Sequence, residues 1–235
     1  MTLGEFFTFL GYLVGALVLF LEARRRNLAT TGMRLVALCG VAGGVLGARL
    51  SEWIFGAANT LLAHPSAILD PRNGGKSLVG GLIFGWLSVE IAKRKLGIRR
   101  STGDLWALAL PAGEAVGRIG CTFNECCFGT PFSGVGAVFQ HSEWRYPTQI
   151  YSSLAAALLF GVLLALREKM PREGDLFRLY LLLYGLSRFA IEAFRERNFV
   201  FASFSTVQLI CLETAVFAAI TLLLSHRKMT KLEAV

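Results

Sequence analysis

The stretch FFTFLGYLVGALVLFL, Phe6–Leu21, contains no charged side chain and is almost entirely apolar. A helix needs ~20 mostly apolar residues to cross the hydrocarbon core of a membrane, and the residues that flank this stretch supply the remaining length. The preceding segment, MTLGE, lacks the basic residues that begin a cleaved signal peptide. The stretch is therefore predicted to be a retained transmembrane helix.

Further apolar stretches of similar length follow along the chain. They run over residues 33–54, 78–92, 105–120, 149–166, 176–194 and 205–225. The whole sequence is 54% hydrophobic and only 17% charged, which is too apolar for an ordinary soluble domain. These features predict an all-α integral membrane protein in which residues 1–235 form a single domain of seven transmembrane helices.

Lysine and arginine are distributed unevenly between these spans. Fifteen lie in the first, third and fifth connections and the tail, namely residues 24, 25, 26, 34, 93, 94, 95, 99, 100, 167, 169, 172, 227, 228 and 231. Five lie in the other connections, at residues 72, 76, 145, 195 and 197. The positive-inside rule then places the N-terminus outside and the C-terminus in the cytoplasm. The net charge of +8 is explained by topology, and no nucleic-acid partner is predicted.

Four arginines lie inside or at the edges of the predicted spans, and three of them lie near the same face. In the predicted topology Arg49, Arg118 and Arg188 all lie in the outer half of the membrane. A charged side chain at this depth costs several kcal/mol or more, so such residues are functional candidates. An anionic partner such as a lipid phosphate would offset this cost.

Each of these arginines has an acidic residue three or four positions away on its own helix. These residues are Glu52, Glu114 and Glu192. The pairs favour two interpretations: internal ion pairs that hold the helix bundle together, or carboxylates that orient guanidiniums toward a phosphate. Arg195 lies seven residues after Arg188, on the same predicted helix face and closer to the predicted outer surface.

Glycines and cysteines mark the segments around these arginines. Gly80, Gly81 and Gly129 either let helices pack closely or let backbone amides approach a headgroup. The cysteines of GRIGCTFNECCFG, Gly117–Gly129, do not have the spacing of a typical zinc site, even with His141 added. Neither a metal nor a cofactor is therefore predicted, while a disulfide, a nucleophilic thiol and simple packing stay open for these cysteines.

Five blocks in register resemble the prolipoprotein diacylglyceryl transferase family. They are GARL (Gly47–Leu50), SLVGGLIFG (Ser77–Gly85), GRIG with Asn124, Gly129 and Pro131, YPTQIY (Tyr146–Tyr151) and GLSRFAIEAFR (Gly185–Arg195). The chain departs from the family pattern at Val79, where members carry a histidine, and at Cys121, where they carry an asparagine. The Cys-Cys loop marks it as a divergent member.

The resemblance implies a multi-pass transferase of the bacterial cytoplasmic (inner) membrane that functions in lipoprotein biosynthesis. It would transfer the diacylglyceryl group of phosphatidylglycerol, or of another anionic phospholipid, to the lipobox cysteine in the signal peptide of a prolipoprotein. Arg118 and Arg188 match the family's essential arginines, and we predict that they are catalytic together with Glu192. The predicted substrate-binding residues are Arg49, Gly80, Gly81, Asn124, Gly129, Gln149, Tyr151 and Arg195.

Two other functions use the same arginine site. The protein could transfer a lipid-derived group to a different acceptor, since the family histidine is absent. It could also bind or transport phospholipid without catalysis. Glu192, Glu114, His141 and the leaving phosphate are the candidate acceptors for the proton of a substrate thiol.

Overall fold

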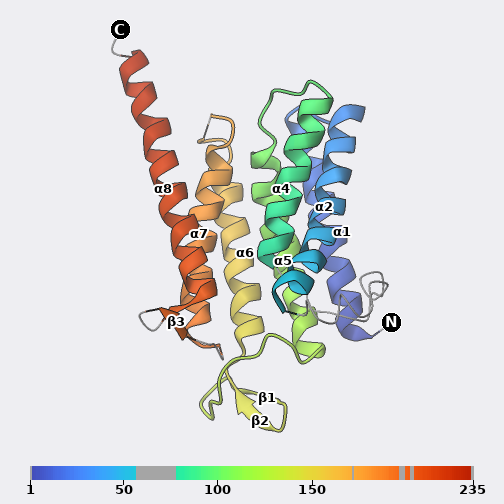
Figure 1. Cartoon of the computed structure of the whole chain (residues 1–235), viewed down its shortest axis with the longest axis vertical. Coiled ribbons are helices and arrows are strands. Elements are labelled where there is room, and N and C mark those ends of the chain that lie inside the picture. Colours follow the sequence, from blue (N-terminus) through green and yellow to red (C-terminus); the bar gives the residue numbers. More distant parts are fainter. Residues whose placement is uncertain (1, 57–77, 171, 196–198, 202–203, 234–235) are drawn as a thin grey trace. The chain divides into compact units, whose positions relative to one another are not determined.

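The chain is almost entirely helical in the computed structural model, which describes residues 2–56, 78–170, 172–195, 199–201 and 204–233. The described helices are α1 (Leu3–Arg25), α2 (Thr31–Gly56), α4 (Leu78–Lys95), α5 (Gly103–Phe123), α6 (Thr148–Leu166), α7 (Asp175–Glu192) and α8 (Thr206–Glu233). These seven helices coincide with the seven predicted spans, so the all-α fold is confirmed (Figure 1).

Four of the helices are long and apolar enough to cross a membrane by length and composition alone. They are α1, α2 over Thr31–Ser51, α6, and α8 over Thr206–Ser225. Large apolar side chains such as Leu38, Leu158 and Phe217 are exposed on them, as expected for helices that face lipid. The crossing of all seven helices and the orientation of the termini stay predictions.

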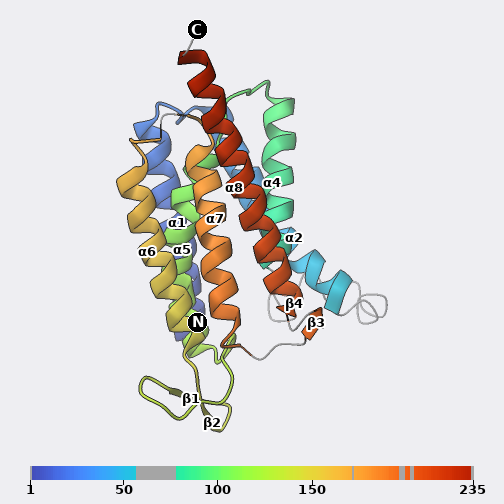
Figure 2. The same ribbon diagram turned by 90° about the vertical axis from the view of Figure 1, so that its left-hand side faces the viewer.

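One compact unit contains α1 and α5 to α8. Helix α7 contacts both α6 and α8 (Figure 2). The buried core of this unit is built from Ala107, Leu108, Leu159, Leu163, Leu176 and Tyr180. Helices α1 and α5 approach through glycines, because a Cβ atom added to Gly113 would lie only 2.8 Å from the carbonyl oxygen of Gly11.

A second compact unit, Arg24–Arg100, contains α2 and α4. Its two helices pack closely at small residues. A Cβ atom at Gly80 would overlap the hydroxyl of Ser51, and one at Gly81 would lie 3.2 Å from the carbonyl oxygen of Gly44. These contacts support the packing interpretation of both glycines, and their role in substrate binding stays a prediction.

A hairpin in the connection from α5 to α6 was not predicted from the sequence. Strands β1 (Val138–Gln140) and β2 (Glu143–Arg145) are antiparallel and pair Gln140 with Glu143. His141 and Ser142 form the turn with φ of 51° and 65°, the positive values that tight hairpin turns require. A second short hairpin, β3 (Phe199–Phe201) and β4 (Phe204–Ser205), precedes α8.

Candidate functional site

Arg118 and Glu114 form an ion pair on α5, as predicted from their spacing. Arg118 Nε donates a hydrogen bond to Glu114 Oε1 at 3.0 Å, and Arg118 Nη2 lies 2.9 Å from the same oxygen. The two side chains are only 15% and 17% exposed. One carboxylate oxygen therefore holds two nitrogens of the guanidinium, which restrains its orientation.

Arg188, Glu192 and Arg195 form a second charged group at the end of α7. Glu192 Oε2 lies 2.7 Å from Arg188 Nη2 and 3.9 Å from Arg195 Nη1. The Arg188 and Glu192 side chains are 12% and 7% exposed, so little water surrounds the pair. Arg188 Nη1 is buried and donates a hydrogen bond to no other described residue. This guanidinium therefore retains a donor for a ligand.

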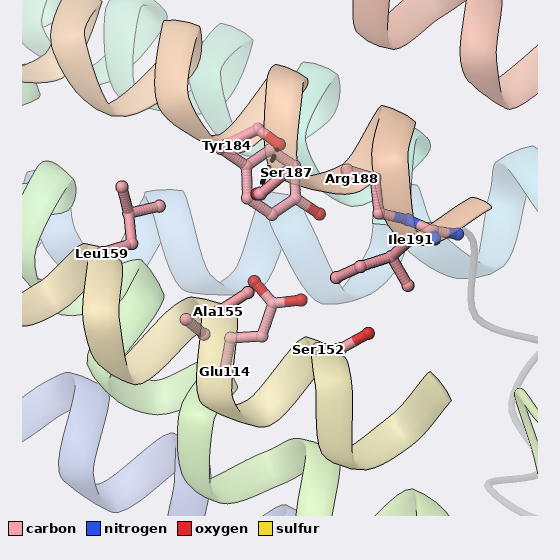
Figure 3. A pocket seen from close by; sticks show the side chains of 9 residues that line it. Glu114, Ser152, Ala155, Leu159, Tyr184, Ser187, Arg188 and Ile191 are labelled. Atoms are coloured by element: carbon pink, nitrogen blue, oxygen red, sulfur yellow. Dashed lines mark hydrogen bonds between the residues drawn. The ribbon is translucent and has the colours of Figure 1, made fainter. Parts of the chain in front are cut away.

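One member of each group, Glu114 and Arg188, lines a small cavity between α5, α6 and α7 (Figure 3). Its polar lining comprises Glu114, Ser152, Tyr184, Ser187 and Arg188. The buried hydroxyl of Tyr184 forms no hydrogen bond within the described part of the chain. Glu114 also holds Arg118, so the cavity is bordered by Arg188 and by the carboxylate partner of Arg118. The cavity encloses about 10 Å³, roughly the space of one water molecule, so a phosphate group requires side-chain movement.

The third predicted arginine, Arg49, lies on α2 in the other compact unit. Its convergence with Arg118 and Arg188 therefore stays a prediction. The side chains of Glu52 and Val79 lie outside the described residues. His64 and the outer-loop segment DPRNGG, residues 70–75, also lie outside them.

The three cysteines of residues 121–127, called here the cysteine loop, converge. Cys121 lies in the last turn of α5, and Cys126 and Cys127 follow the helix. The sulfur atoms of Cys121, Cys126 and Cys127 all lie within 4.8 Å of one another, and all three thiols are free. Hydrogen bonding with the other two thiols lowers the pKa of Cys127 far below its usual range; the charges of Arg195 and Arg118 assist, while burial opposes. Hydrogen bonding with Cys121 and Cys127 raises the pKa of Cys126. The three thiols therefore lie close enough to interact with one another.

Two residues at the start of α6 hold the cysteine loop in place. Thr148 Oγ1 donates a hydrogen bond to the Cys127 carbonyl at 2.7 Å, and Gln149 Nε2 donates one to the Cys126 carbonyl at 2.9 Å. Gln149 Nε2 also donates to Gln140 Oε1 at 2.9 Å, which ties the hairpin to the loop. Both Thr148 and Gln149 are buried, so these contacts are shielded from water.

The remaining predicted substrate-binding residues have structural contacts. Asn124 caps the C-terminal end of α5, and its backbone N–H donates a hydrogen bond to the Gly120 carbonyl at 3.0 Å. At Gly129 the backbone approaches the segment after α7 closely, because an added Cβ atom would lie 2.7 Å from the Phe194 carbonyl oxygen. The Tyr151 ring packs edge-on against Phe194. These contacts give the residues structural roles, and their contact with substrate stays a prediction.

Sequence reasoning missed Tyr184, Thr148 and Gln140 as members of the site. Tyr184 lies four residues before Arg188, one turn away on the same face of α7, and this spacing could have identified it. Thr148 stands beside the predicted Gln149. Gln140 carried no local signal, because its role depends on a hairpin that brings it to Thr122 and Gln149.

Comparison with known proteins matches nearly the whole chain to one family. The family model for prolipoprotein diacylglyceryl transferase covers residues 5–224. Relatives named phosphatidylglycerol–prolipoprotein diacylglyceryl transferase include one from Clostridium tetani that is 31% identical over 79% of this chain and 77% of its own length. Another, from Symbiobacterium thermophilum, is 30% identical over 85% of this chain and 79% of its own length. Both arginine–glutamate pairs and the cysteine loop lie inside the matched range, and the chain therefore belongs to the prolipoprotein diacylglyceryl transferase family.

Proposed function

We propose that this protein transfers the diacylglyceryl group of phosphatidylglycerol to the lipobox cysteine thiol of prolipoproteins at the outer face of the bacterial inner membrane. The names of its relatives support this donor and acceptor. The observation that carries the proposal is that one cavity is lined by Glu114 and Arg188, which belong to two buried arginine–glutamate pairs. Two polar groups at this cavity, Arg188 Nη1 and the Tyr184 hydroxyl, are buried and unbonded within the described residues.

In the proposed topology all seven helices cross the membrane, with the N-terminus outside and the C-terminus in the cytoplasm. Arg118 lies in the final turns of α5 and Arg188 in the final turns of α7, so both lie toward the predicted outer face. The cysteine loop and the β1–β2 hairpin extend from the same end of α5 (Figure 1). Phosphatidylglycerol would then enter from the outer leaflet.

The donor carries one negative charge on its phosphodiester. A guanidinium presents several N–H donors in a planar fork that fits phosphate oxygens, and Arg188 Nη1 is one such donor. Glu114 and Glu192 fix the orientation of Arg118 and Arg188, so we assign Glu192 a positioning role toward Arg188. The Tyr184 hydroxyl can donate a further hydrogen bond to the phosphate.

The reaction is an alkylation of sulfur. The acceptor thiolate attacks the glycerol carbon that bears the phosphate ester, a carbon–sulfur bond forms, and the carbon–oxygen bond breaks. Glycerol phosphate leaves with one more negative charge than the phosphodiester had. The two arginines stabilise this developing charge, which is where preorganised donors lower a barrier most.

The test compares three arginine-to-lysine variants in nanodiscs that contain phosphatidylglycerol. Lysine keeps the charge but removes the planar fork, so Arg118→Lys and Arg188→Lys should each slow transfer to a lipobox peptide by about 100-fold. Arg178→Lys is the matched control, because Arg178 also lies on α7 and pairs with an acidic residue, Asp175. Wild-type transfer rates in both site variants would contradict the proposal.

A further inference from the structure

The cluster formed by the sulfur atoms of Cys121, Cys126 and Cys127 is not used by the phosphate chemistry above. Cys121 lies near the end of α5, and the other two lie in the turn that follows. Glu125 and Cys127 have φ of 46° and 60°, the left-handed conformation that non-glycine residues seldom adopt. The turn at Glu125 folds the chain back, so that the Cys126 backbone N–H donates to the Cys121 carbonyl at 3.1 Å.

The spacing of the sulfur atoms suits a thiophilic metal ion. Zinc–thiolate bonds are about 2.3 Å long, and in a tetrahedral site this places the sulfur atoms roughly 3.8 Å apart. The cluster, with all separations within 4.8 Å, needs a contraction of at most about 1 Å, which rotation about the Cα–Cβ bonds can supply. The backbone around two of the thiols is already anchored by Thr148 and Gln149.

The described protein residues supply three ligands to this cluster and leave a fourth position open. His141 is the nearest imidazole candidate in the sequence, but its Nε2 lies 2.9 Å from the Glu125 carbonyl oxygen and it is not a member of the group of converging ligands. Three protein ligands and one exchangeable position are typical of catalytic zinc sites. The position could therefore accept an external ligand.

We propose that Cys121, Cys126 and Cys127 bind one thiophilic divalent metal ion such as zinc, and that its open position binds the acceptor thiol as a thiolate. This inference rests on the proposed function, which requires a thiol acceptor. Metal coordination deprotonates a thiol outright, so this step needs no protein general base.

The step balances in atoms and charge. The acceptor thiol displaces water from the metal and releases its proton to solvent. Its sulfur then uses a lone pair to attack the glycerol carbon, the carbon–oxygen bond electrons leave with the phosphate, and the thioether product dissociates from the metal. No oxidant or reductant takes part.

The surrounding charges support such a site. Three thiolates and one divalent ion carry a net charge of −1, and an acceptor thiolate makes it −2. The positive charges of Arg195 and Arg118 both act on Cys127 and offset this negative charge. Cys121 follows Arg118 by three residues, one turn along α5, which places the nucleophile beside the guanidinium that binds the phosphate.

The experiment loads reduced, metal-free wild-type protein with Co²⁺ as a spectroscopic probe. One equivalent should bind and produce thiolate-to-cobalt charge-transfer bands. The Cys→Ser variants at positions 121, 126 and 127 should each weaken binding at least tenfold. The matched controls Cys39→Ser and Cys211→Ser should bind as the wild type does. Size-exclusion profiles identify any variant that fails to fold, and removal and reloading of metal in the wild type provides a second measurement.

A lipobox peptide then tests the open position. The cysteine peptide should shift the cobalt spectrum toward four thiolates, whereas a peptide with serine in its place should not. Absence of metal binding after reduction, a disulfide that persists among the three cysteines, or full transfer activity in metal-free protein would overturn the inference. The last result would leave the proposed function intact. A peptide-dependent cobalt shift without any thioether product would support the metal site and contradict the proposed function.

Discussion

Replacement of Glu192 by glutamine removes one charge from the Arg188 pair and changes the side-chain shape very little. The charge centres of a close pair lie about 4 Å apart, which corresponds to about 4 kcal/mol at an effective dielectric constant of about 20. That constant is appropriate because the two side chains are 12% and 7% exposed. The amide oxygen of glutamine keeps a polar contact with Arg188 Nη2, which lies 2.7 Å from Glu192 Oε2 in the wild type, and this contact is worth about 1.5 kcal/mol. We expect Glu192→Gln to lower the free energy of unfolding by about 2 to 3 kcal/mol.

The same substitution should slow diacylglyceryl transfer. If the lost energy is also lost from the transition state, the rate falls by about 30- to 150-fold, because each 1.4 kcal/mol is tenfold. The matched control is Asp175→Asn, since Asp175 is a buried acid on the same helix that pairs with Arg178. The control should also destabilise the protein but leave transfer per folded molecule unchanged.

Denaturation in mild detergent gives the free energies of unfolding, and peptide transfer in nanodiscs gives the rates. The reasoning is refuted if Glu192→Gln unfolds and transfers as the wild type does. It is also refuted if the variant loses stability but, like Asp175→Asn, keeps its transfer rate, because Glu192 would then stabilise the bundle without positioning Arg188.

Four further substitutions test other parts of the structure. Gly113→Ala should destabilise the protein by about 1 to 3 kcal/mol through overpacking between α1 and α5, whereas Gly161→Ala, with open space around it, should stabilise α6 by up to about 1 kcal/mol in the same unfolding assay. Gln149→Leu should free the Cys126 carbonyl and speed thiol labelling by maleimide severalfold; an unchanged labelling rate would show that Gln149 does not hold the loop. Tyr184→Phe should slow transfer about tenfold without loss of stability, because the hydroxyl is buried and unpaired within the described residues. Wild-type transfer by that variant would exclude the hydroxyl from phosphate binding.

The helices could be predicted because their signal is local. Apolar stretches of sufficient length give the positions of all seven described helices, even where Glu114 and Arg118 interrupt the pattern. The ends agree to within a few residues, except that α8 continues to Glu233, beyond the predicted end at residue 225. The two arginine–glutamate pairs could also be predicted from the sequence, since a spacing of four residues places both members on one helix face.

The cysteine cluster could not be predicted in the same way. Its formation depends on two residues with positive φ and on hydrogen bonds from Gln149, twenty-three positions after Cys126. None of these features is encoded by residue type alone, because glutamate and cysteine seldom adopt the left-handed conformation. The sequence spacing therefore argued against a metal site, while the folded loop brings the three thiols together.

The absence of the family histidine at Val79 gives the cysteine loop added significance. Glu114 and Glu192 are both held in ion pairs with arginines, which ties them to positioning roles. A metal-bound acceptor thiolate needs no protein base at all. The divergence of the loop and the loss of the histidine are then two parts of one change in how the acceptor is activated.

The most direct test of the central claim follows one oxygen atom through the reaction. Purified protein would receive a lipobox peptide and phosphatidylglycerol with a heavy oxygen isotope in the ester bond between the diacylglyceryl carbon and phosphorus. Attack at carbon, with the arginines stabilising the phosphate that leaves, predicts a thioether peptide and heavy oxygen in the released glycerol phosphate, both detected by mass spectrometry. Heavy oxygen retained in free diacylglycerol, or no thioether from protein that demonstrably binds the lipid, would contradict the account.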